Sequence, residues 1–197
     1  QGELHIGGSF SNLGFLFLQE HTILGVQANG FSNQGLLQGY GTLTAHGNDK
    51  ILVNHGTIAP GLEDWVGHLT INGDLLLTEF SVIDIDLSSA VDRDLLSISG
   101  SLSVGGTLNI QALNHYAPQV GDEFKIMTFD RRTNDVRFTL LTDATQPYQY
   151  EAIYSESDIT LRVSSVPEPE AWTLMGLGLS ALWLGSHRRS RRQRAAA

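Results

Sequence analysis

The sequence predicts an all-β fold, a right-handed parallel β-helix in which short strands stack as a solenoid, for most of this 197-residue chain. Glycine is frequent, with 21 residues, and proline is sparse, with 5, which is typical of many short turns with few rigid kinks. Between the turns, apolar and polar residues alternate with a period of two, as in strands with one buried face. The strand units also share one form, which favours a solenoid over a sandwich or a barrel.

The repeat units span residues 1–129. Each has a glycine, an alternating segment and a turn of Gly, Asn or Asp, as in Gly67–Asp74. In Val82–Leu87, aliphatic residues occupy one face and aspartates the other. Stacking of such strands predicts a continuous aliphatic core inside a polar shell. The aliphatic residues are Ile83, Ile85 and Leu87, and the acidic ones are Asp84 and Asp86.

Part of this region resembles the β-helix repeats of autotransporter-like passenger proteins of bacteria. The resemblance extends from about Gly56 to Phe129 and follows the same order of segments. The matching segments are His55–Gly61, Leu69–Leu77, Asp84–Asp86, Asp94–Ile110 and Gly121–Phe129. The resemblance implies a fold and export from the cell, not an activity.

Residues 130–165 depart from the repeat and contain three further strand patterns, at Arg137–Leu141, Ala152–Tyr154 and Asp158–Val163. A solenoid exposes unpaired strand edges at its end unless another segment covers them. We therefore expect residues 130–165 to form a C-terminal β cap. The N-terminal end shows no comparable segment, so we expect the repeats to be truncated there and to continue upstream of Gln1.

The remaining residues, 166–197, begin with a proline-containing motif at Val166–Glu170. Pro167 and Pro169 each fix φ, remove a backbone donor and push the preceding residue into an extended conformation. The motif should therefore be an extended, exposed peptide that a processing enzyme can grip.

An apolar run follows at Ala171–Gly185, with no charged residue and with Trp172 and Trp183 near its ends. Indole rings are enriched at membrane interfaces, so this run predicts a single transmembrane helix. As a helix it is about 22 Å long, short of the roughly 30 Å hydrocarbon core. Thinning of the bilayer and snorkelling of the flanking side chains can cover this difference.

A basic tail at residues 186–194 sets the orientation, because cationic flanks stay on the cytoplasmic side. Residues 1–165 are then expected outside the cytoplasm. The arginines that set this topology are Arg188, Arg189, Arg191, Arg192 and Arg194.

The three parts together resemble the PEP-CTERM sorting signal of Gram-negative bacteria. The matching residues are the motif Val166, Pro167, Glu168 and Pro169, the apolar run and the basic tail. The resemblance implies recognition by an exosortase, a membrane protease-transpeptidase that cuts near the motif. It also implies transient anchoring in the inner membrane and final delivery to the cell surface or to the extracellular matrix of a biofilm.

Charge and composition exclude several classes of function. Residues 1–165 carry 7 Lys and Arg against 19 Asp and Glu, a formal charge of −12, which argues against nucleic acid as a partner. The chain has no cysteine, which excludes disulfides and thiolate metal sites. No phosphate-binding glycine loop and no Gly-x-Ser-x-Gly elbow occurs, and we predict no cofactor and no catalytic residue.

Two groups of residues keep other functions open. Asp84, Asp86, Asp92 and Asp94 form the densest acidic group, and Asp84 and Asp86 are weak candidates for calcium ligands or for an acid/base pair. Tyr148, Tyr150 and Tyr154 could stack on a carbohydrate, although packing is the commoner reason for such a pattern. The seven histidines show no spacing of two or four between them, so the sequence reveals no histidine ligand pair.

The sequence therefore predicts a non-enzymatic exported protein of the cell surface or matrix, sorted by an exosortase, with extracellular polysaccharide as a further partner. Two alternatives stay open, an extracellular polysaccharide-degrading β-helix enzyme and a carbohydrate-binding adhesive module. Loss of polysaccharide-degrading activity in the Asp84→Asn and Asp86→Asn variants would indicate the enzyme. Weakened carbohydrate binding after replacement of the tyrosines would indicate the adhesive module.

Overall fold

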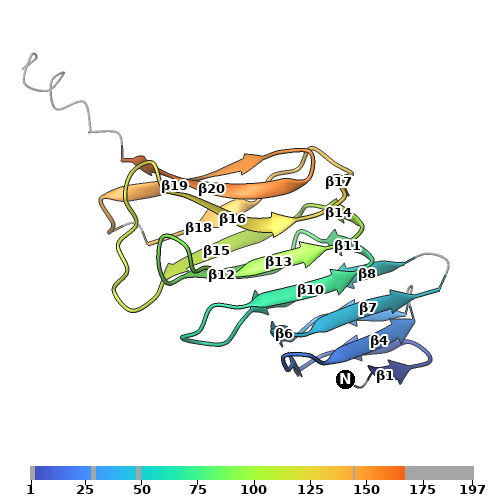
Figure 1. Cartoon of the computed structure of the whole chain (residues 1–197). Helices are drawn as coiled ribbons and strands as arrows, with labels where there is room; N and C mark the ends of the chain where they lie inside the picture. Colours follow the sequence, from blue (N-terminus) through green and yellow to red (C-terminus); the bar gives the residue numbers. More distant parts are fainter. Residues whose placement is uncertain (1–2, 28–29, 48–49, 144, 167–197) are drawn as a thin grey trace, which may run out of the picture. The chain divides into compact units, whose positions relative to one another are not determined.

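The computed structural model describes residues 3–27, 30–47, 50–143 and 145–166, and it shows an all-β solenoid of about 5 turns (Figure 1). The described residues contain no helix. The predicted solenoid is thus confirmed, while its right-handed sense stays a prediction. None of the described segments is a helix long and apolar enough to cross a membrane.

Three sheets, here called A, B and C, form the walls of the solenoid, and each turn contributes one strand to each sheet in the order A, B, C. Successive turns pair in parallel within every sheet. Sheet A contains β1 (Glu3–Ile6), β4 (Ile23–Gln27), β7 (Thr42–His46), β10 (His68–Asn72), β13 (Leu95–Ile98) and β16 (Glu123–Thr128). Sheet B contains β2 (Phe10–Asn12), β5 (Phe31–Asn33), β8 (Ile51–Asn54), β11 (Asp74–Leu77), β14 (Ser101–Ser103) and β17 (Arg131–Arg132). Sheet C contains β3 (Phe15–Leu18), β6 (Leu36–Gly39), β9 (Thr57–Pro60), β12 (Val82–Leu87), β15 (Thr107–Ala112) and β18 (Thr139–Leu141).

One aliphatic core runs through the stacked turns, because alternate residues of every wall point inward. On β12, the predicted inward residues Ile83, Ile85 and Leu87 are at most 1% exposed, while the aspartates between them lie on the outer face. Burial of each such side chain contributes about 1.5–3 kcal/mol. The inward–outward pattern predicted from the sequence is confirmed here.

The core also contains a ladder of buried asparagines at the ends of β2, β5 and β8. Asn12 donates from Nδ2 to Oδ1 of Asn33 over 2.7 Å, and Asn33 donates in the same way to Asn54 over 2.7 Å. The Nδ2 group of Asn33 also donates to the carbonyl oxygens of Gly35 and Thr57, over 3.2 and 3.0 Å. The amides of Asn12 and Asn33 thereby tie their turns to the next one at the corner between sheets B and C, while that of Asn54 donates to Gly56 within its own turn.

Glycine occupies the same corner in three successive turns, at Gly14, Gly35 and Gly56. Leu36 donates its backbone N–H to the carbonyl oxygen of Gly14 over 2.7 Å, and Thr57 donates to that of Gly35 over 2.8 Å. A Cβ atom on Gly35 would overlap the backbone of Gly14, and one on Gly56 would overlap that of Gly35. The close stacking of turns therefore requires glycine at positions 35 and 56, the later position of each stacked pair.

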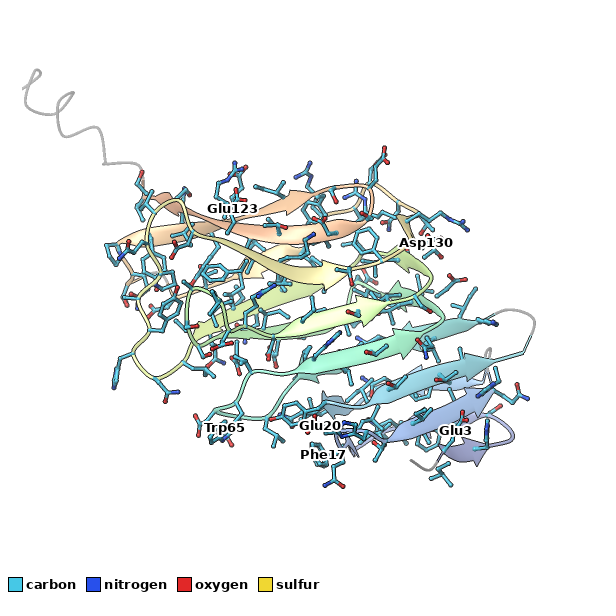
Figure 2. The ribbon with its side chains drawn as sticks, in the orientation of Figure 1. Glu3, Phe17, Glu20, Trp65, Glu123 and Asp130 are labelled. Atoms are coloured by element: carbon cyan, nitrogen blue, oxygen red, sulfur yellow. The ribbon has the colours of Figure 1, made fainter. Side chains whose placement is uncertain are left out.

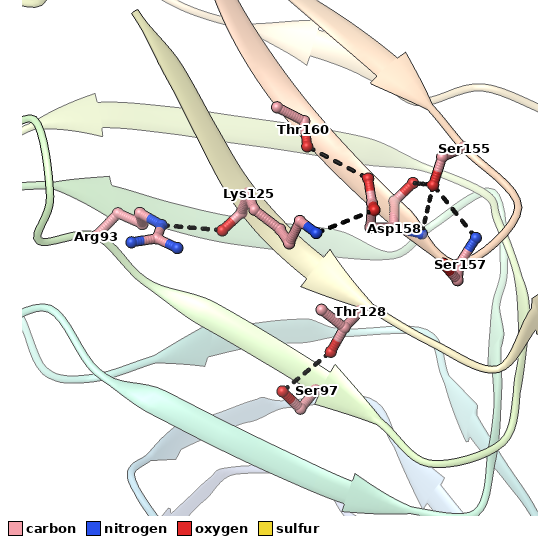
Figure 3. Close-up of polar contacts among 8 residues, drawn as sticks. All are labelled: Arg93, Ser97, Lys125, Thr128, Ser155, Ser157, Asp158 and Thr160. Carbon is pink, nitrogen blue, oxygen red and sulfur yellow. Dashed lines mark hydrogen bonds and ion pairs between the residues drawn. The ribbon is translucent and has the colours of Figure 1, made fainter.

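Two antiparallel strands, β20 (Asp158–Ser165) and β19 (Tyr148–Tyr154), extend sheet A beyond β16. Lys125 on β16 forms an ion pair with Asp158 on β20, 3.1 Å between Nζ and Oδ2 (Figure 3). Sheets B and C end at β17 and β18. The strands predicted within residues 130–165 are present, and their role as a cap for the solenoid stays a prediction.

By its contacts the chain divides into two units, Gln1–Ser165 and Val166–Ala197. Val166 directly follows β20 and is 45% exposed. The rest of the proposed sorting signal, residues 167–197, lies outside the described residues. The predictions made for its motif, helix and arginines therefore stay predictions.

Candidate functional site

The longest connections of the solenoid emerge at one corner, where sheet C leads into sheet A. They are residues 61–67 after β9, 88–94 after β12 and 113–122 after β15. Because every turn repeats the order of the sheets, these loops lie above one another along the edge of sheet C. Trp65 projects from the first of them and is 71% exposed (Figure 2). In solenoids, insertions on one face often form the binding surface, so this corner is a candidate binding surface.

The outer face of sheet C next to this corner is acidic. Asp84 and Asp86 project outward from β12, opposite Asn109 and Gln111 of β15. Asn109 donates from Nδ2 to Oδ1 of Asp84 over 2.9 Å. The two aspartates predicted to share an outward face therefore do so, and one of them is bound to the next turn.

Asp94, in contrast, is part of the interior. Its side chain is 1% exposed, and it accepts backbone hydrogen bonds from Gly67 over 2.6 Å and from Asp86 over 3.0 Å. Burial raises the pKa of Asp94 to about 8, although these two N–H groups lower it in part. The residue thus joins the 61–67 loop to β12, which is a structural role.

The four aspartates do not converge as a single group. Asp92 lies exposed in the loop after β12, where its N–H donates to Oγ of Ser89 over 2.9 Å. Burial, followed by the charges of Asp84 and Asp64, raises the pKa of Asp86 to about 6. Among the residues that the structure describes, no three of these carboxylates lie close enough to hold one metal ion.

We expect the raised pKa of Asp86 to lower stability as the pH rises. In the folded chain the carboxyl group keeps its proton up to about pH 6, whereas the ordinary pKa is 3.8, so its favourable contribution is present at acidic pH and lost between these values. The full shift in the pKa of Asp86 corresponds to ~3 kcal/mol of stability. Because Asp86 is partly exposed, solvent screens much of this effect. We therefore expect Asp86→Asn to raise the free energy of unfolding by about 1 kcal/mol near pH 8.

Denaturant titrations of Asp86→Asn and of the unchanged chain, near pH 3.5 and near pH 8, measure this effect. The gain should be present at the higher pH and absent at the lower one. Asp130→Asn, which removes a charge from an exposed turn, is the matched control. An equal gain in both variants would mean that net charge, and not the environment of Asp86, is responsible.

A groove of about 670 Å³ opens beyond the acidic face, at the C-terminal end of the same corner. Its walls come from the end of β15, the loop after it, the loop that precedes β19, and β19 itself. The lining is mixed, with aromatic rings beside amides and hydroxyls. The aromatic and amide side chains in the lining are those of Asn109, Gln111, Tyr116, Gln146, Tyr148 and Tyr150.

The structure brings two of the three predicted tyrosines into this groove. Tyr148 and Tyr150 meet edge to face, with ring centroids 5.6 Å apart, and both also pack against the core. Tyr116, which the sequence did not single out, joins them from the 113–122 loop, and its hydroxyl donates to Oδ2 of Asp122 over 3.4 Å. Three rings and several amides at a groove can recognise a sugar chain through stacking and hydrogen bonds.

Tyr154 does not belong to the groove. Its ring lies against the guanidinium groups of Arg132 and Arg137, at 5.1 and 5.0 Å from the centroid. Its hydroxyl oxygen accepts the backbone N–H of Phe138 over 2.9 Å. Packing, the commoner reason for such a tyrosine, explains this residue.

No protein-family model matches this sequence, and a search of curated proteins found no match.

One cluster of side chains has no local signal in the sequence. His5 and His46 meet beside Glu3 on the outer face of sheet A. The spacing of two between Glu3 and His5 was visible in the sequence, but His46 lies 43 residues beyond Glu3, and only the stacking of turns shows that it is a neighbour. Histidine–histidine spacing alone could not reveal this pair.

Proposed function

We propose that the chain is a non-enzymatic exported protein that an exosortase sorts to the surface or extracellular matrix of a Gram-negative cell. The observation that carries this proposal is the order of three features after Ser165: a Val-Pro-Glu-Pro motif, an apolar run that can cross the inner membrane, and a cluster of arginines. Orientation follows from the arginines, which hold their end of the run in the cytoplasm.

The folded body supports this proposal. The last strand, β20, ends at Ser165, immediately before the motif, and Val166 is exposed. A protease can grip only a peptide that is free of the sheet, so a motif that begins where the strand ends is suitably placed. The acidic walls of the solenoid also suit a protein that must stay soluble outside the cell.

The groove supports extracellular polysaccharide as the partner. Cleavage of a glycosidic bond generally needs two carboxyl groups on either side of the bond, one of them protonated. Of the described residues that line the groove, Asp143 is the one that carries a carboxyl group. Hydrogen bonds from Thr145 and Gln146 lower the pKa of Asp143, which disfavours a role as the acid. The geometry favours binding of a sugar chain over cleavage.

Replacement of both motif prolines tests the sorting proposal. In a Gram-negative host with an exosortase, we expect the unchanged chain to lose its C-terminal segment and to reach the cell surface or medium. The Pro167→Ala/Pro169→Ala variant should accumulate uncut in the membrane fraction, measured by immunoblotting of fractionated cells. Pro147→Ala, an exposed proline of the folded body, serves as the control and should be processed normally. Normal processing of the double variant would refute the sorting proposal.

The same fractionation experiment, carried out with a variant of the groove, tests polysaccharide binding independently of sorting. Tyr148→Ala should be cut and exported normally but released from the matrix by washing, with retention lower by about tenfold, the effect of losing ~1.4 kcal/mol of binding. Gln149→Ala, an exposed neighbour on the same strand that does not line the groove, should be retained. Equal retention of both variants would contradict the polysaccharide partner and leave the sorting proposal standing.

A further inference from the structure

Three adjacent strands at the N-terminal end of sheet A bring together a carboxylate and two imidazoles. Glu3 and His5 are two residues apart on β1 and so project from the same face. His46 projects from the same face of β7, two strands away, and β4 lies between them. Figure 1 shows β1, β4 and β7 as neighbours, and Figure 2 labels Glu3 at this end of the solenoid.

The three side chains converge on one point. Oε1 of Glu3 lies 3.3 Å from Nε2 of His5 and 3.2 Å from Nε2 of His46. The imidazole rings have centroids 4.6 Å apart and are inclined by 48°, so they do not stack. One ligand atom from each residue lies within 4.8 Å of the other two. Of the residues that the structure describes, these are the three that form such a group.

Gly25 on β4 provides the space in which they meet. It pairs with His5 on one side and with Thr44 on the other, directly beneath the cluster. A Cβ atom at this position would lie 2.6 Å from Nδ1 of His5, 2.7 Å from Nε2 of His46 and 2.9 Å from Oε1 of Glu3. The missing side chain thus leaves a recess in the strand face, and all three polar groups reach into it.

We propose that Glu3, His5 and His46 bind a divalent transition metal ion, with Zn²⁺ as the ion that their chemistry favours. Two imidazoles and one carboxylate are a common zinc ligand set, and a water molecule completes the tetrahedron. With metal–ligand bonds of about 2.0–2.1 Å, the ligand atoms of a tetrahedral site are about 3.3 Å apart. The distances from the glutamate oxygen to both imidazole nitrogens match this value.

The site is accessible and suits an imidazole-binding ion better than calcium. The side chains of Glu3, His5 and His46 are 35%, 57% and 39% exposed, so an ion can enter from solvent. Calcium prefers six or more oxygen ligands, whereas imidazole suits zinc, copper, nickel and cobalt. A bound ion would also connect β1 to β7 across β4, and would therefore stabilise the first strand of the sheet.

Metal titration of the full chain, produced without an affinity tag and kept in mild detergent, tests the proposal. We expect one Zn²⁺ per chain by calorimetry, a rise in melting temperature with Zn²⁺ concentration, and the visible absorption of tetrahedral Co²⁺ when cobalt replaces zinc. His46→Ala should weaken Zn²⁺ binding by at least about 100-fold, because loss of even an outer hydrogen-bond partner of a ligand costs 10–100-fold.

Gly25→Ala is the sharper variant, because it retains all three ligands and closes the recess between them. The neighbours of the added methyl group are the ends of flexible side chains, so the fold should persist, with an unchanged far-UV circular dichroism spectrum. Zn²⁺ binding should be lost to the same extent as in His46→Ala.

His21→Asn is the matched control. His21 is also an exposed histidine beside a glutamate, with Nδ1 3.8 Å from Oε1 of Glu20, but it belongs to no group of three ligands among the described residues. Asparagine tolerates the positive φ of 61° at this position. The control should bind Zn²⁺ as the unchanged chain does. If the unchanged chain does not bind Zn²⁺, or if Gly25→Ala and His46→Ala bind it as tightly as the unchanged chain does, the cluster is only a hydrogen-bonded group and the proposal is wrong.

Discussion

Replacement of Asn33 by alanine is expected to lower the free energy of unfolding by about 3 kcal/mol. Asn33 is 0% exposed, and its amide accepts from Asn12 and donates to Asn54, Gly35 and Thr57. The truncated variant would leave Oδ1 of Asn54 and the carbonyl oxygen of Thr57 without this buried donor. Each buried polar group that loses its partner costs about 1–3 kcal/mol.

Urea denaturation followed by circular dichroism measures this loss. Ser32→Ala is the control, because Ser32 lies on the same strand but projects from the outer face. It should change stability by less than about 0.5 kcal/mol, as most surface substitutions do. If Asn33→Ala changed the free energy of unfolding by as little, the prediction would be wrong, and water would replace the hydrogen bonds of the asparagine ladder at little cost.

We expect the second large effect from Gly35→Ala, which should lower the free energy of unfolding by about 3 kcal/mol. This value is at the upper end of the typical cost of overpacking a well-packed position. The added Cβ atom would overlap the carbonyl oxygen of Gly14, a backbone atom that cannot move without loosening the hydrogen bond from Leu36 to it. The turns would have to separate, and separation costs contacts on all three walls.

Gly14→Ala provides an unusually close control. Gly14 occupies the same corner one turn earlier, but no atom lies within 4 Å of its Cβ position. We expect a change within about 0.5 kcal/mol there. Comparable losses of stability in both variants would mean that the intrinsic cost of alanine at this corner, and not the stacking of turns, decides the outcome.

Much of the fold could be predicted because the alternation of residues is a local signal. Val82–Leu87 shows its inward and outward faces from six consecutive letters, and β12 confirms them. The asparagine ladder had an equally simple signal, a spacing of 21 residues between Asn12, Asn33 and Asn54, each followed two residues later by glycine. This signal is absent from the later, more regular repeats, where Leu77 takes the place of asparagine in register with Asn54.

The candidate sites were harder to predict because the length of the turns varies. The pairing offset is 20 residues between Glu3 and Ile23 but 32 between Thr107 and Thr139, because residues 113–122 lengthen the corner between sheets C and A and residues 133–138 the corner between sheets B and C. No fixed period can therefore place Tyr116 beside Tyr148. For the same reason, the four aspartates looked like one group, and the structure separates them into an outward pair, a buried residue and a loop residue.

By itself, the sequence determined that the chain is built of short strands with one apolar face, that these strands stack, and that the body is acidic. These properties depend on neighbouring residues, whose side chains alternate whatever lies beyond them. Only the tertiary structure decided which turn lies on which, and with it the groove, the buried Asp94 and the meeting of Glu3 with His46. Such contacts depend on the register between turns, and register is the sum of every loop length in between.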